Sequence, residues 1–211
     1  ILPLSFSASP FFEFTREFMN LEPEAWSLRW YRQMVGISSI GDTTVVSNKW
    51  MLGTRNSFII GISATFLATA LGTVAALGLS RPNMPFKGTI MAVLISPMIV
   101  PLIITSAGMF FFYSKIGLTH TYLGLILAHT ALGTPFVVIT VTATLTGFDT
   151  NLIRASQSLG ADTMRTFFKV IMPLILPGVI SGALFAFITS FDEVVVVMFV
   201  GSVEQITIPK Q

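Results

Sequence analysis

The sequence predicts an all-α integral membrane protein, a bundle of several membrane-crossing helices, on three observations. Of the 211 residues, 53% are hydrophobic and only 10% are charged, whereas a soluble domain carries about 25% charged residues. The mean hydropathy is +0.79. Four stretches of 22 to 33 residues contain no charge at all. This composition argues against a soluble enzyme and excludes a disordered chain, and a net charge of +2 gives no argument for nucleic acid.

Each uncharged stretch is long enough for one crossing of the bilayer. A helix needs about 20 mostly apolar residues to cross a hydrocarbon core roughly 30 Å thick, and lipid offers no partners for the backbone of any other structure. We therefore predict four helical spans, near 57–79, 89–113, 122–145 and 174–200. Four prolines inside them should bend the helices: Pro97, Pro101, Pro135 and Pro177.

Basic residues in the loops predict the orientation of the spans. The second loop holds only Lys115, whereas the first and third loops together hold five basic residues: Arg81, Lys87, Arg154, Arg165 and Lys169. Because positive loops stay in the cytoplasm, we expect loops 80–88 and 146–173 to be cytoplasmic. The segment 1–56 is then outside. It also holds five basic residues, but long segments are translocated largely regardless of charge.

The outer segment 1–56 is rich in both charged and aromatic residues. We expect either a folded loop whose aromatic side chains pack at the rim of the bundle, or a docking surface for an external partner. A short helix is predicted from Ser27 to Met34, with Ser27 as its cap. The chain starts without Met, and we expect a further span at each end.

The loop 146–173 is the most informative part of the sequence. Two polar helical pieces meet at Gly160, with Asp149 or Thr150 as the first N-cap and Asp162 or Thr163 as the second. Pro173 ends the second piece or opens the fourth span. Such a polar unit cannot lie in the bilayer, so it must rest on the membrane surface or enter a groove of a partner. Arg165 and Lys169 share a face that suits phosphates or acidic side chains.

This loop resembles the cytoplasmic coupling loop of binding-protein-dependent ABC transporter permeases, whose pattern is E-A-A-x-x-x-G-x(9)-I-x-L-P. The chain has Arg154-Ala155-Ser156, three residues, Gly160, nine residues, and then Val170-Ile171-Met172-Pro173. The spacing is kept, while Arg154 reverses the charge of the family's Glu. Further likeness runs from about residue 27 to the end, in Asn56-Ser57, Leu71–Ala76, Arg81-Pro82 and Pro173–Val179. Ser27–Tyr31 and Ser190–Glu193 resemble the spermidine/putrescine branch.

The resemblance implies a polytopic bundle of the type I ABC importer (MetI-like) kind in the bacterial inner membrane, with a span lacking at each end of this chain. The domain would occupy 57–211. It implies a non-catalytic subunit without a cofactor of its own, surrounded by lipid. Its partners would be a second, usually different, permease, an external solute-binding protein, and separate ATP-binding subunits that carry ATP and Mg. The residues implied in coupling are Arg154, Ala155, Ser156, Leu159, Gly160, Ala161, Arg165, Lys169 and Pro173.

Carboxylates in the outer part of the fourth span are candidates for the solute path. Intramembrane acids are costly and usually functional, so Asp192 or Glu193 can meet the ammonium groups of a polyamine. Alternatively the span ends near Phe191, and the acids are interfacial or cap a following short element. Ser190 and Thr189 are further path candidates.

Other polar and small residues in the spans favour structural roles. The spacing of Ala64, Ala68, Gly72 and Ala76 permits close helix packing. His129 is a hydrogen-bonded structural or pore-lining residue, because one histidine within a span, with no carboxylate nearby in sequence and no Cys in the chain, makes a metal site improbable.

Several functions stay open on the sequence alone. The first is the permease subunit of a polyamine importer. The same fold can carry ferric iron, thiamine or an organic anion. Two alternatives remain. One is a secondary transporter or channel that works without an ATPase, and the other is a structural subunit whose partner forms the whole pore.

Overall fold

The computed structural model of the chain describes residues 2–9, 13–28, 31–32, 37–40, 43–46, 49–81, 83–149 and 151–210. The membrane part contains α3 (Lys49–Leu79), α4 (Lys87–Ile99), α5 (Leu102–Ile116), α6 (Tyr122–Thr146), α9 (Met172–Phe191) and α10 (Val195–Val200). The loop before α9 contains α7 (Asn151–Ser158), α8 (Thr163–Thr166) and the π-helical turn η3 (Phe167–Ile171). The short helix η4 (Ile208–Lys210) follows α10.

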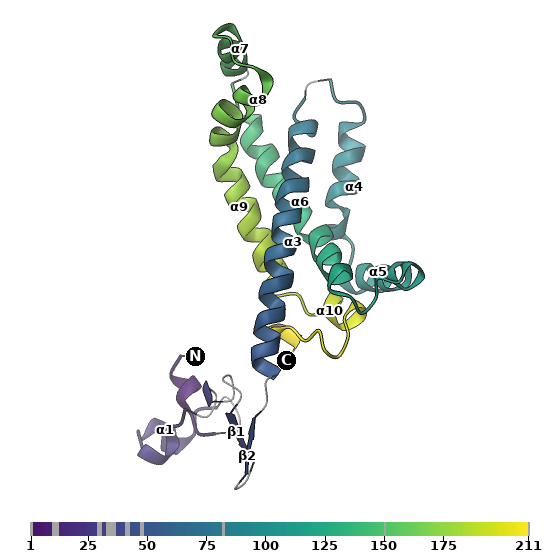
Figure 1. Cartoon of the computed structure of the whole chain (residues 1–211). Helices are drawn as coiled ribbons and strands as arrows, with labels where there is room; N and C mark the ends of the chain where they lie inside the picture. Colours follow the sequence, from purple (N-terminus) through teal and green to yellow (C-terminus); the bar gives the residue numbers. More distant parts are fainter. Residues whose placement is uncertain are drawn as a thin grey trace.

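Helices α3, α6 and α9 pack against one another and form the centre of the bundle (Figure 1). Their contact depends on small residues. Ala64, Ala68 and Ala76 of α3 are at most 1% exposed, and a Cβ atom on Gly72 would lie only 2.7 Å from the Cβ of Val137 on α6. The predicted packing role of this stripe is confirmed.

Three helical segments are long and apolar enough to cross a membrane: Lys49–Leu79, Tyr122–Thr146 and Thr163–Phe191. The pair α4 and α5 adds a fourth if it is counted as one span, but its two helices meet at 103°. The predicted bend within 89–113 is therefore present, while the single crossing predicted for this stretch stays a prediction. The break follows from Pro101, which has no N–H to donate to the preceding turn and forces Val100 into an extended conformation (ψ 135°).

The last predicted span, 174–200, is also interrupted. Helix α9 ends at Phe191, and α10 begins four residues later. At its other end, α9 is continuous with α8 and η3, so that helical structure runs from Thr163 to Phe191. Pro173 lies at the second residue of α9, directly after the π-helical turn η3 and inside this continuous helical segment.

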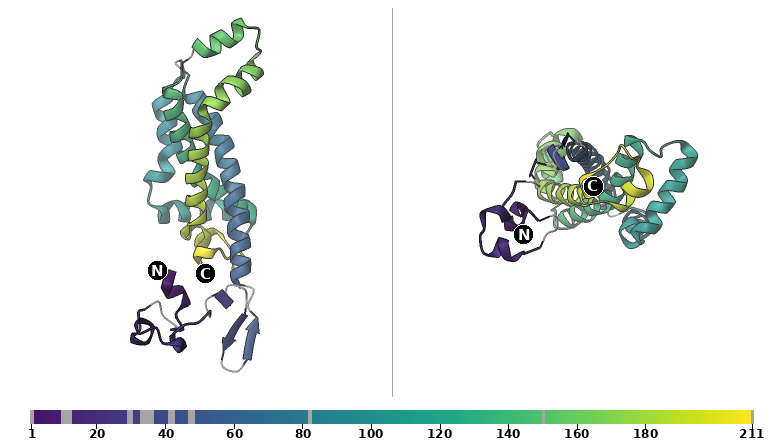
Figure 2. Two further views of the ribbon diagram at one scale, coloured as in Figure 1. Left: turned by 90° about the vertical axis from the view of Figure 1, so that its left-hand side faces the viewer. Right: turned by 90° about the horizontal axis from the view of Figure 1, so that it is seen from below.

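The outer segment forms a small unit at the end of the bundle opposite α7 and α8 (Figures 1 and 2). It contains η1 (Leu2–Phe6), α1 (Arg16–Met19), η2 (Pro23–Ala25) and an antiparallel hairpin of β1 (Ile37–Ile40) and β2 (Thr43–Val46). Leu4, Phe18 and Ala25 form its core, and Phe18 stacks on Trp26 with ring centroids 4.7 Å apart. The hairpin departs from the all-α prediction, and the predicted helix over 27–34 includes residues outside those described.

Candidate functional site

The loop between α6 and α9 folds as a helix–turn–helix, with Asp162 as the predicted cap of α8 and Asp149 bonded to the start of α7, while Thr150 lies outside the described residues. Oδ1 of Asp149 accepts a hydrogen bond from the Asn151 N–H (2.9 Å), and Oδ1 of Asp162 accepts one from the Arg165 N–H (2.8 Å). Gly160 lies between the helices with φ at +81°, a conformation that favours glycine. The chain therefore reverses sharply at Gly160 and returns α8 beside α7.

A pair of hydroxyl groups holds the two arms of this unit together. The oxygens of Ser156 and Thr166 lie 2.9 Å apart, and Thr166 is only 2% exposed. Because the Ser156 hydroxyl already donates to the Ile153 carbonyl (2.8 Å), Thr166 is the donor of the pair. This bond depends on the serine that stands where the family pattern has its second alanine.

The outward surface of the unit is unusually apolar for an exposed helix–turn–helix. Leu159 at the turn is 89% exposed, Met164 is 65% exposed and Phe168 is 58% exposed. The basic residues Arg154, Arg165 and Lys169 are exposed on the same unit. The unit extends beyond the end of the bundle in Figure 1 and in the left view of Figure 2. An exposed apolar patch with a charged rim is typical of a protein interaction site.

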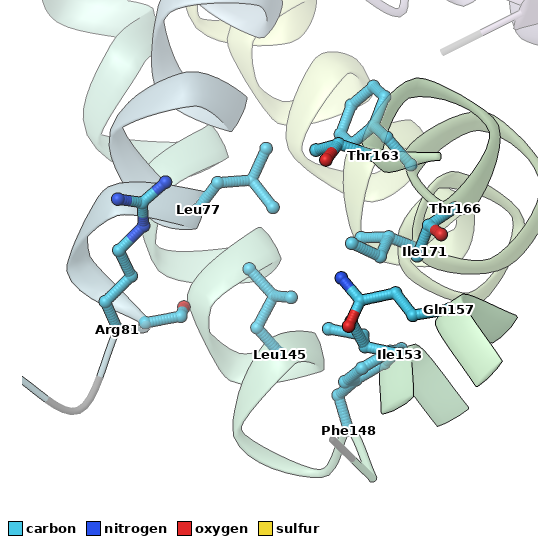
Figure 3. A pocket seen from close by; sticks show the side chains of 11 residues that line it. Leu77, Arg81, Leu145, Phe148, Ile153, Gln157, Thr163, Thr166 and Ile171 are labelled. Atoms are coloured by element: carbon cyan, nitrogen blue, oxygen red, sulfur yellow. The ribbon is translucent and has the colours of Figure 1, made fainter. Parts of the chain in front are cut away.

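A cavity of about 380 Å³ separates this unit from the ends of α3 and α6 (Figure 3). Ile153 and Gln157 of α7 lie on one side of it, and Leu77 and Leu145 lie on the other. Helix α7 makes its main contacts with α8 and η3, which belong to the same unit. The unit is therefore attached to the bundle chiefly through the continuous helix Thr163–Phe191.

A second cavity of about 380 Å³ lies at the bend between α4 and α5. Thr189 and Glu193 line it, opposite residues 97–102 of the bend, together with Leu132 and Phe136 of α6. Glu193 is 7% exposed, and its Oε1 accepts a hydrogen bond from the Val196 N–H (2.9 Å). No described residue contacts its Oε2 by a hydrogen bond. Glu193 thus caps α10, as the alternative interpretation allowed, and it also lines the cavity.

The other path candidates lie elsewhere. Ser190 is 6% exposed, and its hydroxyl lies 2.8 Å from Nδ1 of His129, which is itself 1% exposed. His129 is therefore a buried, hydrogen-bonded residue, as predicted. Asp192 is exposed at the end of α9, and its N–H donates to the Ile188 carbonyl. No group of three or more potential metal ligands occurs among the residues that the structure describes.

A polar network closes the end of the bundle opposite α7 and α8, and sequence reasoning missed it. Nδ2 of Asn56 donates to the carbonyl groups of Glu204 (3.2 Å) and Ile206 (2.9 Å), while its Oδ1 accepts from the Tyr122 hydroxyl (2.9 Å). Lys210 donates to the Val197 carbonyl (3.3 Å), and burial lowers the pKa of its ammonium group. The network fastens the segment after α10 across the N-terminal parts of α3 and α6.

Residues 39–210 match the family described as binding-protein-dependent transport system inner membrane component. The chain belongs to this family. Its membership confirms three predictions: the recognition of the family, the multi-pass location in the inner membrane, and a non-catalytic transport subunit rather than an enzyme.

Individual relatives are named as polyamine permeases. The chain is 29% identical over 196 residues to the spermidine/putrescine transport system permease protein PotC of Haemophilus influenzae, covering 93% of this chain and 72% of that protein. It is 27% identical to PotC of Escherichia coli (84% and 63%) and 29% identical to the putrescine permease PotI of E. coli (87% and 64%). The chain therefore spans about two thirds of the length of these relatives.

The fold is shared with a solved transporter. A chain in the crystal structure of a bacterial ABC transporter involved in the import of the acidic polysaccharide alginate superposes with a TM-score of 0.73 at 16% identity, covering 99% of this chain and 68% of that one. Together with the family match, this confirms the predicted helical membrane bundle of the MetI-like kind.

Proposed function

We propose that the chain is a permease subunit of an ABC importer for a polyamine-like solute, coupled to separate ATP-binding subunits through the loop 146–173. The observation that carries the proposal is the helix–turn–helix of α7 and α8, held clear of the bundle with Leu159 89% exposed at its turn. Met164 and Phe168 are also exposed on this unit, and several exposed apolar side chains on one small unit favour a surface that a partner covers. The nucleotide and its Mg would bind to that partner, and this chain would hold no cofactor.

The coupling role rests on how the unit is attached. A displacement of the coupling unit by its partner would move α9 as well, because helical structure continues from Thr163 to Phe191. The far end of α9 reaches Thr189 and, just beyond it, Glu193 at the second cavity. One helix therefore connects the surface offered to an ATP-binding subunit with the cavity offered to solute. Coupling also requires that the partner contact the two states of the permease differently.

The choice of a cationic solute rests on Glu193. A carboxylate that is 7% exposed beside apolar side chains is costly unless it is paired. One of its oxygens has a backbone partner, and the other is available at the cavity. An ammonium group of spermidine or putrescine would satisfy it. The names of the relatives support the same solute class. A second permease subunit would complete the path, and an external binding protein would deliver the solute.

The test is polyamine uptake by the intact transporter in cells lacking other polyamine importers. Glu193→Gln keeps an acceptor for the Val196 N–H but removes the charge. We expect KM for spermidine to rise at least about tenfold, since a hydrogen bond to a charged group contributes about 1.5 to 3 kcal/mol. The matched control is Glu204→Gln, which neutralises an exposed acid on the same side of the membrane. Unchanged uptake in Glu193→Gln, or competition by an organic anion but not by putrescine, would exclude the cationic solute.

A further inference from the structure

The cavity between the coupling unit and the bundle has a mixed lining (Figure 3). Six apolar side chains form most of its wall: Leu77, Leu145, Phe148, Ile153, Phe167 and Ile171. The polar lining residues are Ser80, Arg81, Gln157, Thr163 and Thr166. A ligand that fits this wall must have an apolar body and a polar end.

Only some of the polar groups are available to such a ligand. The Ser80 hydroxyl donates to the Ala76 carbonyl (2.7 Å), and Thr166 is paired with Ser156. In the described part of the chain, the side chains of Arg81, Gln157 and Thr163 have no hydrogen-bond partner, and Arg81 has no ion-pair partner. Arg81 and Gln157 stand on opposite sides of the cavity (Figure 3). The charge at the cavity is therefore a single, uncompensated cation.

The depth of the cavity indicates where a ligand would come from. Arg81 follows the end of α3 at Leu79, and Phe148 follows the end of α6 at Thr146. Both helices cross the membrane, so the cavity lies at the boundary between hydrocarbon and water. Phospholipids at this depth offer an apolar chain next to a phosphate. An arginine forms paired, charge-assisted hydrogen bonds with phosphate oxygens.

We propose that this cavity binds an anionic phospholipid from the leaflet on the side of the coupling loop. Arg81 binds the headgroup phosphate, Gln157 and Thr163 bind oxygens of the glycerol region, and the six apolar side chains cover the start of an acyl chain. Because α7 forms one wall and the bundle forms the other, the bound lipid braces the coupling unit against the bundle. The proposed function supplies only the orientation, which makes this the cytoplasmic leaflet.

A free inorganic phosphate offers the same group to Arg81 but leaves the apolar wall exposed to water. Burial of apolar surface is worth roughly 25 cal/mol per Å², so the wall favours the ligand that covers it. Two measurements therefore distinguish a bound phospholipid from a bound inorganic phosphate: the preference for one lipid over another, and displacement by soluble phosphate.

The experiment is native mass spectrometry of the protein purified from its membrane in mild detergent, followed by addition of phosphatidylglycerol or phosphatidylcholine. We expect the wild type to retain phosphatidylglycerol in preference to phosphatidylcholine. Arg81→Gln should lower that retention about fivefold, the effect expected of one basic residue at an anionic membrane surface. Lys87→Gln is the matched control, because Lys87 belongs to the same loop region but does not line the cavity.

A second variant tests the contribution of the apolar wall to lipid binding separately from that of the Arg81 charge. Leu145→Trp fills the cavity while keeping Arg81, and it should also lower retention. Equal retention in Arg81→Gln and wild type, equal retention of the two lipids, or displacement of phosphatidylglycerol by millimolar inorganic phosphate would each overturn the proposal. The measurement uses neither ATP nor an ATP-binding subunit, so its failure would leave the proposed coupling function untouched.

Discussion

Replacing Gly160 by Ala tests the turn on which the coupling unit depends. With φ at +81°, this position is strained for any residue with a Cβ, at a cost of roughly 1–2 kcal/mol. No atom lies within 4 Å of the position that a Cβ would occupy, so the effect is conformational and not steric. Helix α7 has only eight residues, and such short helices are marginal on their own. The conformational cost at Gly160 should therefore weaken binding of the coupling unit to the ATP-binding subunit by a similar free energy.

We expect the ATP-binding subunit to bind Gly160→Ala about 5- to 30-fold more weakly than wild type, the range that corresponds to 1–2 kcal/mol. Gly160→Asn should lose less, because asparagine tolerates this backbone region. The assay is the dissociation constant of the purified ATP-binding subunit for the permease in detergent.

Gly147→Ala is the matched control at the other edge of the loop. Gly147 has φ at −88°, and a Cβ there would lie no closer than 3.9 Å to the Thr144 carbonyl oxygen. It should bind like the wild type. Wild-type affinity in Gly160→Ala, or an equal loss in both variants, would refute the role assigned to the turn.

Three other variants test the packing and the polar contacts. Ser156→Ala leaves the buried Thr166 hydroxyl without its acceptor and should destabilise the coupling unit by about 1 kcal/mol, seen as faster amide exchange in α7. Gly182→Ala would place a Cβ 2.8 Å from the backbone of α6 and should lower the melting temperature, at a cost of about 1–3 kcal/mol. Tyr122→Phe removes the hydroxyl bonded to Asn56. The free energy of local unfolding in the segment after α10 should fall by about 1 kcal/mol, seen as faster amide exchange there.

Each variant has an outcome that would contradict its premise. Unchanged exchange in Ser156→Ala would mean that the hydroxyl pair does not hold the arms together. For Gly182→Ala the control is Gly108→Ala on α5, where nothing lies within 4 Å of the added Cβ. If both glycine variants melt alike, the close approach of α6 and α9 is not limiting. Unchanged exchange in the segment after α10 in Tyr122→Phe would mean that the Asn56 network does not hold this segment.

The sequence predicted what depends on local chemistry. Uncharged stretches located the membrane helices, because a charge is costly in lipid wherever it falls in the fold. The caps at Asp149 and Asp162 and the turn at Gly160 were predicted because each depends on residues only a few positions away. The small-residue stripe on α3 was predicted because only a close helix contact explains four small residues at that spacing.

The features that sequence reasoning missed depend on contacts between distant residues. Pro101 was expected to bend a span, but the 103° turn places α5 against α10, a contact that periodicity cannot show. The cap of Glu193 on α10 was only an alternative, since the end of α9 is not marked by a glycine. Asn56 stood out by family likeness alone, because its partners Tyr122 and Ile206 lie 66 and 150 residues away.

The most direct test of coupling is the side of the membrane on which Leu159 lies and what it touches. The chain contains no cysteine, so a single introduced thiol reports without background. In intact cells, Leu159→Cys should resist an impermeant maleimide, whereas Val203→Cys, 84% exposed at the opposite end of the bundle, should react. In opened membranes, Leu159→Cys should cross-link to an ATP-binding subunit, with a yield that changes on ATP addition. Labelling of Leu159→Cys from outside, or cross-links to lipid alone, would contradict the account.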